Sequence, residues 1–360
     1  MERILSSLKR THKIVIALIV LLIVVRIFLP IGIKHAINWY LGNKIVSYQG
    51  AIADFDLHLY RGAYEILGLK LWKRNSDRET PLVDAKRIDL SLAWRALWRR
   101  KLLGDLKIDR LRLTFIDSES NNKKQFGTDE KNWNAILKKL LPIEIESLKI
   151  TNSEVHFLNR DYKVPVDIYV DRIQVDAANL RNTDQKDVLL PSTATIKGRL
   201  QADAPFSLKA QFNILKDPLA FNIDAQMKDF NLKKMNNFFL VYGPFTFATG
   251  TFSLFSEVAT NKGLVVGYAK PFFENVKMIA NNESFISTKH AIAEFLLGFG
   301  NLILRNPSKD TATRIEFQGA LTSPEINKWE AFWLSLRNAF GSPLQKKIED
   351  DVDIKSLPKR

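Results

Sequence analysis

An apolar run near the N-terminus constrains this chain more than any other feature. Residues 14–25 are all apolar, and after Arg26 the run continues to Ile33. As a helix these residues would extend for about 30 Å, which matches one hydrocarbon core. Arg26 would lie about 10 Å from the outer end, within reach of the headgroups for a snorkelling side chain. The sequence therefore predicts a stub at 1–13 and a transmembrane helix at 14–33.

The alternative is a cleaved signal peptide, because positive charges precede the run. These charges are Arg3, Lys9, Arg10 and Lys13. No small-x-small cleavage site follows the run, so an uncleaved anchor is favoured. The charge asymmetry places the N-terminus in the cytoplasm and the residues from 34 onward outside it. The net charge of +14 then suggests an anionic lipid surface rather than nucleic acid, or a large solvated surface.

The residues that commonly carry catalysis form no recognisable pattern. The chain contains no cysteine, which excludes disulfides, a thiol nucleophile and a cysteine-ligated metal. His290 and Glu294 have i, i+4 spacing, but a zinc site needs further ligands. Segment 263–270 contains glycines but lacks the ending of a phosphate loop, and its pattern indicates a strand. We therefore expect no enzymatic activity, no metal and no cofactor.

Alternation of apolar and polar residues dominates the body of the chain, at 34–341. This period of two is typical of half-buried strands. It occurs at 55–59, 88–92, 111–115, 164–170, 206–214, 219–227, 245–247 and 264–268. Helical patterns are confined to 129–140, 232–240, 290–304 and a segment that begins at Pro324. The sequence predicts a mainly β fold, a long, curved and twisted antiparallel sheet with a few short helices, followed by a charged, disordered tail at 342–360.

A weak internal repeat runs through the body. Residues 106–117 resemble residues 148–159, with a shared Leu-Lys-Ile, then an aromatic position, then an aliphatic residue and Asp or Asn. Such a repeat fits strands that are added serially to one long sheet. Chance agreement between two amphipathic strands is the alternative.

A sheet with one apolar face normally needs a second layer to cover it. The predicted helices are too few for this many strands, so an open, curved sheet would leave an apolar channel suited to acyl chains. An ordinary closed core is the alternative interpretation. The candidate residues of this lipid groove are Phe206, Leu208, Phe212, Phe221, Ile223, Phe245 and Phe247.

A basic, tryptophan-containing segment at 94–101 is the second candidate site. As a helix it would separate its tryptophans from its arginines, which is the composition of an interfacial helix on anionic lipid. Its candidate residues are Trp94, Arg95, Trp98, Arg99, Arg100 and Lys101. The alternative is a connecting helix whose tryptophans pack on the sheet.

Several motifs resemble the AsmA-like superfamily, in its bacterial branch of membrane-anchored periplasmic proteins. Residues 263–273 (GLVVGYAKPFF) are similar to its G-x-hydrophobic-x-G-Y-x-K-P-hydrophobic-F signature. Residues 315–324 resemble its I-x-x-x-G-x-L-x-x-P ending, and residues 336–340 also match. Upstream, residues 89–92 and 106–111 resemble the N-terminal repeat of the family. The resemblance covers most of residues 1–341.

The resemblance implies a single-pass inner-membrane protein whose periplasmic body is a long, curved β-groove. The implied role is to handle or transfer phospholipid in the cell envelope, with phospholipids, the membrane and other envelope proteins as partners. The chain is far shorter than the largest members, so a complete bridge across the periplasm is not implied. The alternative is a non-enzymatic envelope scaffold that assists outer-membrane assembly, which predicts a closed core without bound lipid.

Overall fold

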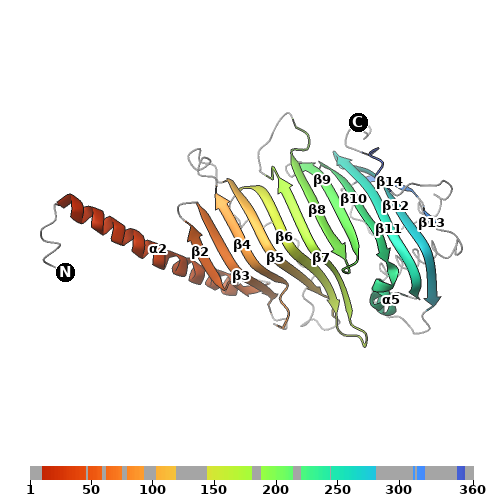
Figure 1. The fold of residues 1–360 in the computed structure, drawn as a ribbon, viewed down its shortest axis with the longest axis horizontal. Helices are drawn as coiled ribbons and strands as arrows, with labels where there is room; N and C mark the ends of the chain where they lie inside the picture. The colour runs from red at the N-terminus through yellow and green to blue at the C-terminus, as the bar shows by residue number, and fades with distance from the viewer. Residues whose placement is uncertain are drawn as a thin grey trace.

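The computed structural model describes one long helix and a single curved, open sheet (Figure 1). The described residues are 10–45, 48–58, 62–74, 79–92, 103–118, 144–180, 188–213, 220–243, 245–280, 311–312, 314–320 and 347–352. The helices are α2 (Arg10–Asn43), the 3-10 helix η2 (Leu232–Met235) and α5 (Asn236–Tyr242). The first strands are β1 (Tyr48–Ala51), β2 (Asp54–His58), β3 (Ala63–Lys73), β4 (Val83–Leu92), β5 (Leu103–Ile116), β6 (Glu144–Asn159) and β7 (Val166–Ala178). The others are β8 (Ser192–Leu200), β9 (Ala204–Asn213), β10 (Ala220–Asn231), β11 (Phe245–Asn261), β12 (Leu264–Ala280), β13 (Thr311–Ala312) and β14 (Ile315–Ala320).

The strands follow one another across the sheet nearly in chain order. The path runs β1-β3-β4-β5-β6-β7-β8-β9-β10-β11-β12-β13, while β2 pairs with β3 and β14 pairs with β12. Every described pair is antiparallel except β5 and β6, which are parallel. The prediction of a mainly β fold with strands added serially is confirmed.

The parallel pair is the predicted repeat. Leu106 of β5 lies opposite Leu148 of β6, and Phe115 lies opposite Phe157. The two repeat units are therefore side by side and in register, so equivalent residues are stacked on the same face. This alignment accounts for the similarity of the two sequences, because matching positions meet matching environments.

Strand register gives the sheet two chemically different faces, since directly opposed residues point to the same side. One aligned row consists of Phe55, Ile66, Ile88, Ile108, Ile150, Val175, Ile196, Leu208, Ala225, Ser256, Ala269 and Ile315. A second row on that side consists of Leu57, Tyr64, Leu90, Leu106, Leu148, Ala177, Ala194, Ala210, Ile223, Val258, Gly267 and Phe317. We call this side the apolar face.

The row between these two points to the opposite side, which we call the polar face. Its members are Asp56, Glu65, Asp89, Lys107, Lys149, Asp176, Thr195, Lys209, Asp224, Glu257, Tyr268 and Glu316. At about 4.8 Å between strands, each row from β2 to β14 is about 50 Å long. The apolar face is thus continuous along the sheet, longer than a hydrocarbon core is thick.

A series of β-bulges interrupts the ladders at similar heights along many strands. Residues with positive φ inside strands are Gly68, Arg110, Asn152, Arg172, Asp229, Gly250 and Asn275, and most coincide with shifts of register. A bulge bends its strand and increases the local twist. The row of bulges therefore bends neighbouring strands together, which gives the sheet its curvature.

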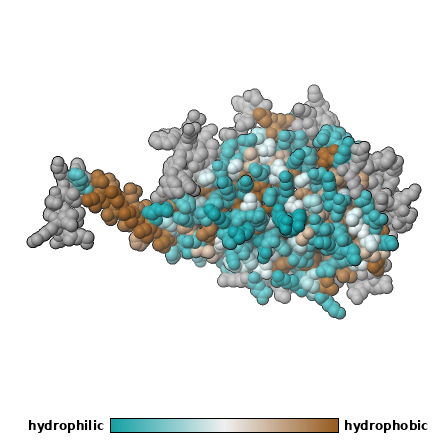
Figure 2. Space-filling model, viewed as in Figure 1, coloured by the Kyte–Doolittle hydropathy of each residue, from teal (hydrophilic) through white to brown (hydrophobic). Residues whose placement is uncertain are grey.

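Helix α2 is long and apolar enough to span a membrane, with a candidate span at Ile14–Asn43. Its N-terminal part extends away from the sheet as a hydrophobic rod, whereas the face of the sheet in view is mainly hydrophilic (Figure 2). The helix continues beyond the predicted end at residue 33. Leu41 is buried in a cluster with Ile52 and Phe55, so the last turns of α2 cover the first strands of the apolar face.

Polar contacts fix the end of α2 on the sheet. The Asn38 amide donates to the carbonyl of Ile52 (3.3 Å) and accepts from its N–H (2.7 Å), as a strand partner would. The Arg74 guanidinium donates to the carbonyls of Gly42 (3.0 Å) and Ile45 (2.9 Å), at the helix C-terminus where carbonyls lack helical partners. The helix and the sheet are therefore held in one orientation.

Close packing at Gly267 provides a test of the register. A Cβ at this position would lie 2.6 Å from the backbone oxygen of Glu257 and 2.6 Å from the Phe317 ring. Gly267→Ala should therefore destabilise the protein by about 1–3 kcal/mol through overpacking. Gly319→Ala is the matched control, because nothing lies within 4 Å of its Cβ, and it should change stability by less than about 0.5 kcal/mol. Thermal unfolding of the two variants in detergent would measure the difference, and equal stabilities would contradict the register.

Candidate functional site: the apolar face

Five of the seven predicted groove residues lie on the part of the apolar face that β9 and β10 form. Phe212 on β9 is opposite Phe221 on β10. Further along the same pair of strands, Ile223 is opposite Ala210 and Leu208 is opposite Ala225. Phe206 lies one position further along β9, beside Gly198. All five side chains are half-buried. The pairing of β9 with β10 thus gathers them into one apolar surface.

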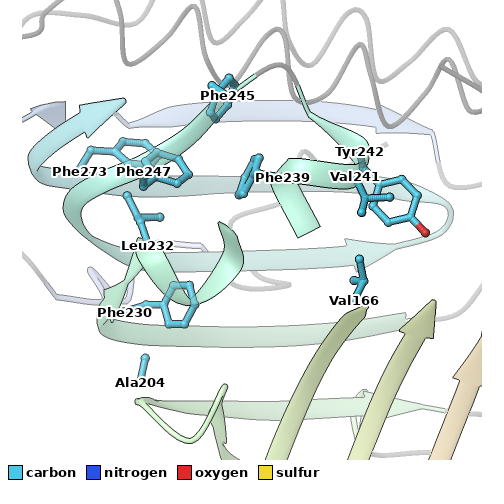
Figure 3. Close-up of a cluster of buried hydrophobic side chains, with 10 residues drawn as sticks. All are labelled: Val166, Ala204, Phe230, Leu232, Phe239, Val241, Tyr242, Phe245, Phe247 and Phe273. Atoms are coloured by element: carbon cyan, nitrogen blue, oxygen red, sulfur yellow. The ribbon is translucent and has the colours of Figure 1, made fainter. Parts of the chain in front are cut away.

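The other two predicted groove residues belong to a closed core. Phe245 and Phe247 are 6% and 1% exposed and lie in the cluster around Phe239 of α5 (Figure 3). The rings of Phe239 and Phe247 meet edge to face, with centroids 5.1 Å apart. Helix α5 therefore covers the apolar face here, and these two phenylalanines are core residues rather than groove lining.

Local hydrogen bonds explain why the chain turns back over the sheet at this point. Asn231 accepts from the N–H of Lys233 at the start of η2, as an N-cap does. The Asn236 amide then donates to the carbonyl of Phe247 (2.9 Å) and accepts from its N–H (2.8 Å). The helix predicted at 232–240 is confirmed. The alternation of residues in β11 alone could not show that this helix packs over the apolar face.

Within the described ranges, the elements that lie against the apolar face are the end of α2, η2 and α5. They cover the strands nearest the anchor and the strand ends around β11. The half-buried side chains of β8 to β10 lie between these coverings. An apolar ligand placed there would remove more hydrocarbon surface from water, at about 25 cal/mol per Å².

The polar face is crossed by ion pairs between neighbouring strands. Arg87 of β4 contacts Glu65 of β3 at 3.0 Å and, within its own strand, Asp89 at 3.1 Å. Arg199 of β8 contacts Asp171 of β7 at 2.6 Å. These pairs neutralise charges that the alternation places side by side. No group of three or more metal-ligating side chains occurs in the part of the chain that the structure describes.

A further polar cluster, missed by the sequence reasoning, lies at the C-terminal end of the polar face. It comprises Glu257, Tyr268, Lys270 and Arg314, and residues 349–352 contact it. Residues 349–352 belong to the segment 342–360 that was expected to be a disordered tail, and they contact the sheet through these bonds. Tyr268 and Lys270 show the i, i+2 spacing of one strand face, but no periodic pattern connects them with acidic residues about 80 positions away.

Other candidates fall outside the described residues. These are Trp94, Arg95, Trp98, Arg99, Arg100 and Lys101 of the basic segment, His290 with Glu294, and the predicted helices at 129–140, 290–304 and from Pro324. The role of the basic segment on anionic lipid stays a prediction.

No protein-family model matches the chain, and no curated protein matches it in sequence. The likeness to the AsmA-like superfamily consequently rests on the motifs in the sequence.

Buried and half-buried phenylalanines of the apolar face should respond differently to truncation. Phe247→Ala would leave a cavity in a closed core and should cost about 3–5 kcal/mol of stability. Phe221→Ala removes a side chain that is already partly solvated and should cost about 1 kcal/mol. Unfolding midpoints of both variants would test this. A larger loss for Phe221→Ala would contradict the division of the apolar face into buried and half-buried parts.

Proposed function

We propose that this chain is a membrane-anchored lipid-binding protein that handles or transfers phospholipid along the apolar face of its sheet. The single observation that supports the proposal is the pair of aligned apolar rows that run from β2, beside α2, to β14. Acyl chains would lie on the half-buried part of this face, and headgroups would remain in water.

The chemistry of such binding needs no specialised side chains. Each methylene group that leaves water contributes about 0.8 kcal/mol, so a long acyl chain can bind to any continuous hydrocarbon surface. A surface built from Phe, Leu, Ile and Ala residues in register provides this continuity. It would favour acyl chains as a class over any one headgroup.

The junction with α2 supports a connection between this face and a bilayer. Ile37 and Leu41 of α2 pack against the first strands of the apolar face, while the N-terminal part of the same helix is exposed. The anchor therefore leads directly to the apolar face. The contacts of Asn38 and Arg74 would keep that face in a fixed orientation relative to the membrane.

The location is part of the same proposal. The basic stub before the anchor favours a cytoplasmic N-terminus, and the AsmA-like motifs favour the bacterial inner membrane with a periplasmic body. Phospholipid in the envelope would then be the substrate.

The closed core under α5 favours a second candidate, an envelope scaffold that assists outer-membrane assembly through protein partners. Phe245 and Phe247 were expected to line a groove and are buried instead. If the remainder of the apolar face were also filled by protein, the chain would have no lipid site and would act through its surface.

Photo-crosslinking in cells would separate the two candidates. A photoreactive phenylalanine analogue is placed at Leu208 on the apolar face or at Lys209, the next residue, which is exposed on the polar face. The lipid proposal predicts phospholipid adducts by mass spectrometry at 208 and several-fold fewer at 209. Adducts to protein alone at 208, in a folded variant, would contradict it and favour the scaffold.

A further inference from the structure

The polar cluster at the C-terminal end of the sheet is buried although it consists of ionisable groups. Glu257 on β11 and Tyr268 on β12 are directly opposed, and the Tyr268 hydroxyl donates to the Glu257 carboxylate at 2.6 Å. Glu257, Tyr268 and Lys270 are each 0% exposed. A buried charge requires partners, and the strands alone do not provide them all.

The missing donors come from the backbone of the C-terminal segment. Four successive N–H groups point at the two carboxylate oxygens of Glu257. The donors are the N–H groups of Glu349 (2.8 Å), Asp350 (2.5 Å), Asp351 (3.1 Å) and Val352 (2.8 Å). Burial alone would raise the pKa of Glu257, but the hydrogen bonds from Tyr268 and from this backbone outweigh it and lower the pKa.

The acidic side chains of the segment meet the cations of the cluster. Glu349 accepts from Lys270 Nζ at 2.6 Å and also contacts Arg314. Asp351 accepts from Arg314 at 2.8 Å. Both cations also lie near the Tyr268 ring, at 4.1 Å for Arg314 and 5.4 Å for Lys270.

The donor and acceptor pattern defines the class of ligand that fits. Lys270 and Arg314 contact carboxylates of the segment, and Arg314 also pairs with Glu316 of β14 at 3.0 Å. A phosphate group could supply an anion of this kind. Glu257 needs several N–H donors, which a phosphate group lacks. The negative charge of Glu257 would also repel a phosphate group. A short peptide with an acidic side chain supplies both, because its backbone donates while its carboxylate accepts.

We propose that Glu257, Tyr268, Lys270 and Arg314 form a recognition site for a short acidic peptide, which residues 349–352 fill reversibly as a C-terminal latch. The contacts of the latch are mainly polar, and its apolar contact is that of Val352 with the cluster around Ala220 and Ala259. Segments with little buried apolar surface open more readily than the strands beneath them. This site is on the opposite face from the proposed lipid surface and does not depend on it.

The closed latch joins strands that are distant in sequence. Glu349 contacts Lys270 on β12 and Arg314, which immediately precedes β14. Glu257 adds β11 to the same assembly. Closure therefore joins the start of β14 to β11 and β12, and opening leaves the site free for another acidic segment.

Hydrogen exchange on the full chain in detergent tests the latch. Glu349→Gln removes an ion-pairing carboxylate and should accelerate exchange of the amides of 349–352 by at least about tenfold, with the amides of β11 and β12 unchanged. Asp350→Asn is the matched control, because Asp350 is exposed and Asn tolerates its positive φ of 58°. It should change exchange by less than about twofold. Unchanged exchange in Glu349→Gln, or loss of protection only together with β11 and β12, would overturn the proposal.

Binding in trans tests whether the site recognises a peptide. A fluorescent peptide with the sequence of residues 345–356 is titrated onto the full-length Glu349→Gln protein. Saturable binding that inorganic phosphate does not displace, and that a further Glu257→Gln substitution abolishes, supports the proposal. No binding, binding that survives Glu257→Gln, or displacement by phosphate would overturn it.

Discussion

The rest of the structure depends on the cross-strand register, which keeps apolar residues on one side of the sheet from β2 to β14. A slip of one residue at any pair would exchange the two faces from that strand onward. The rows that contain Ile66 and Tyr64 stay apolar across the sheet, with Ser256 as the polar exception in the first. Bulges interrupt the ladders, yet these rows remain aligned.

This constraint gives one sheet two separate chemistries. The apolar face begins under α2, is covered again by α5, and between them presents half-buried side chains that suit acyl chains. The polar face satisfies its charges by cross-strand ion pairs and, at its end, by the backbone and carboxylates of 349–352. Because successive residues alternate between faces, lipid and peptide would bind at once without competing for side chains.

The sequence predicted what depends on local pattern. Alternation predicted most strands, helical spacing predicted 232–240, and the repeat at Leu106 and Leu148 predicted serial strands, though not their parallel pairing. Burial of Phe247 was not predictable, because it depends on α5 packing over β11. A strand covered in this way and a strand with an exposed apolar side show the same alternation of residues. The latch was equally hidden, because Lys270 and Glu349 meet only through tertiary structure.

Native mass spectrometry of the full chain, released gently from detergent, would show whether the apolar face holds phospholipid. A basic protein with one membrane helix and no such sheet, purified from the same membranes, controls for lipid held by an anchor alone. If the apolar face binds lipid, at least one phospholipid per chain should survive detergent exchange and exceed the control. A folded, lipid-free protein would contradict it and show that the apolar face is filled by protein.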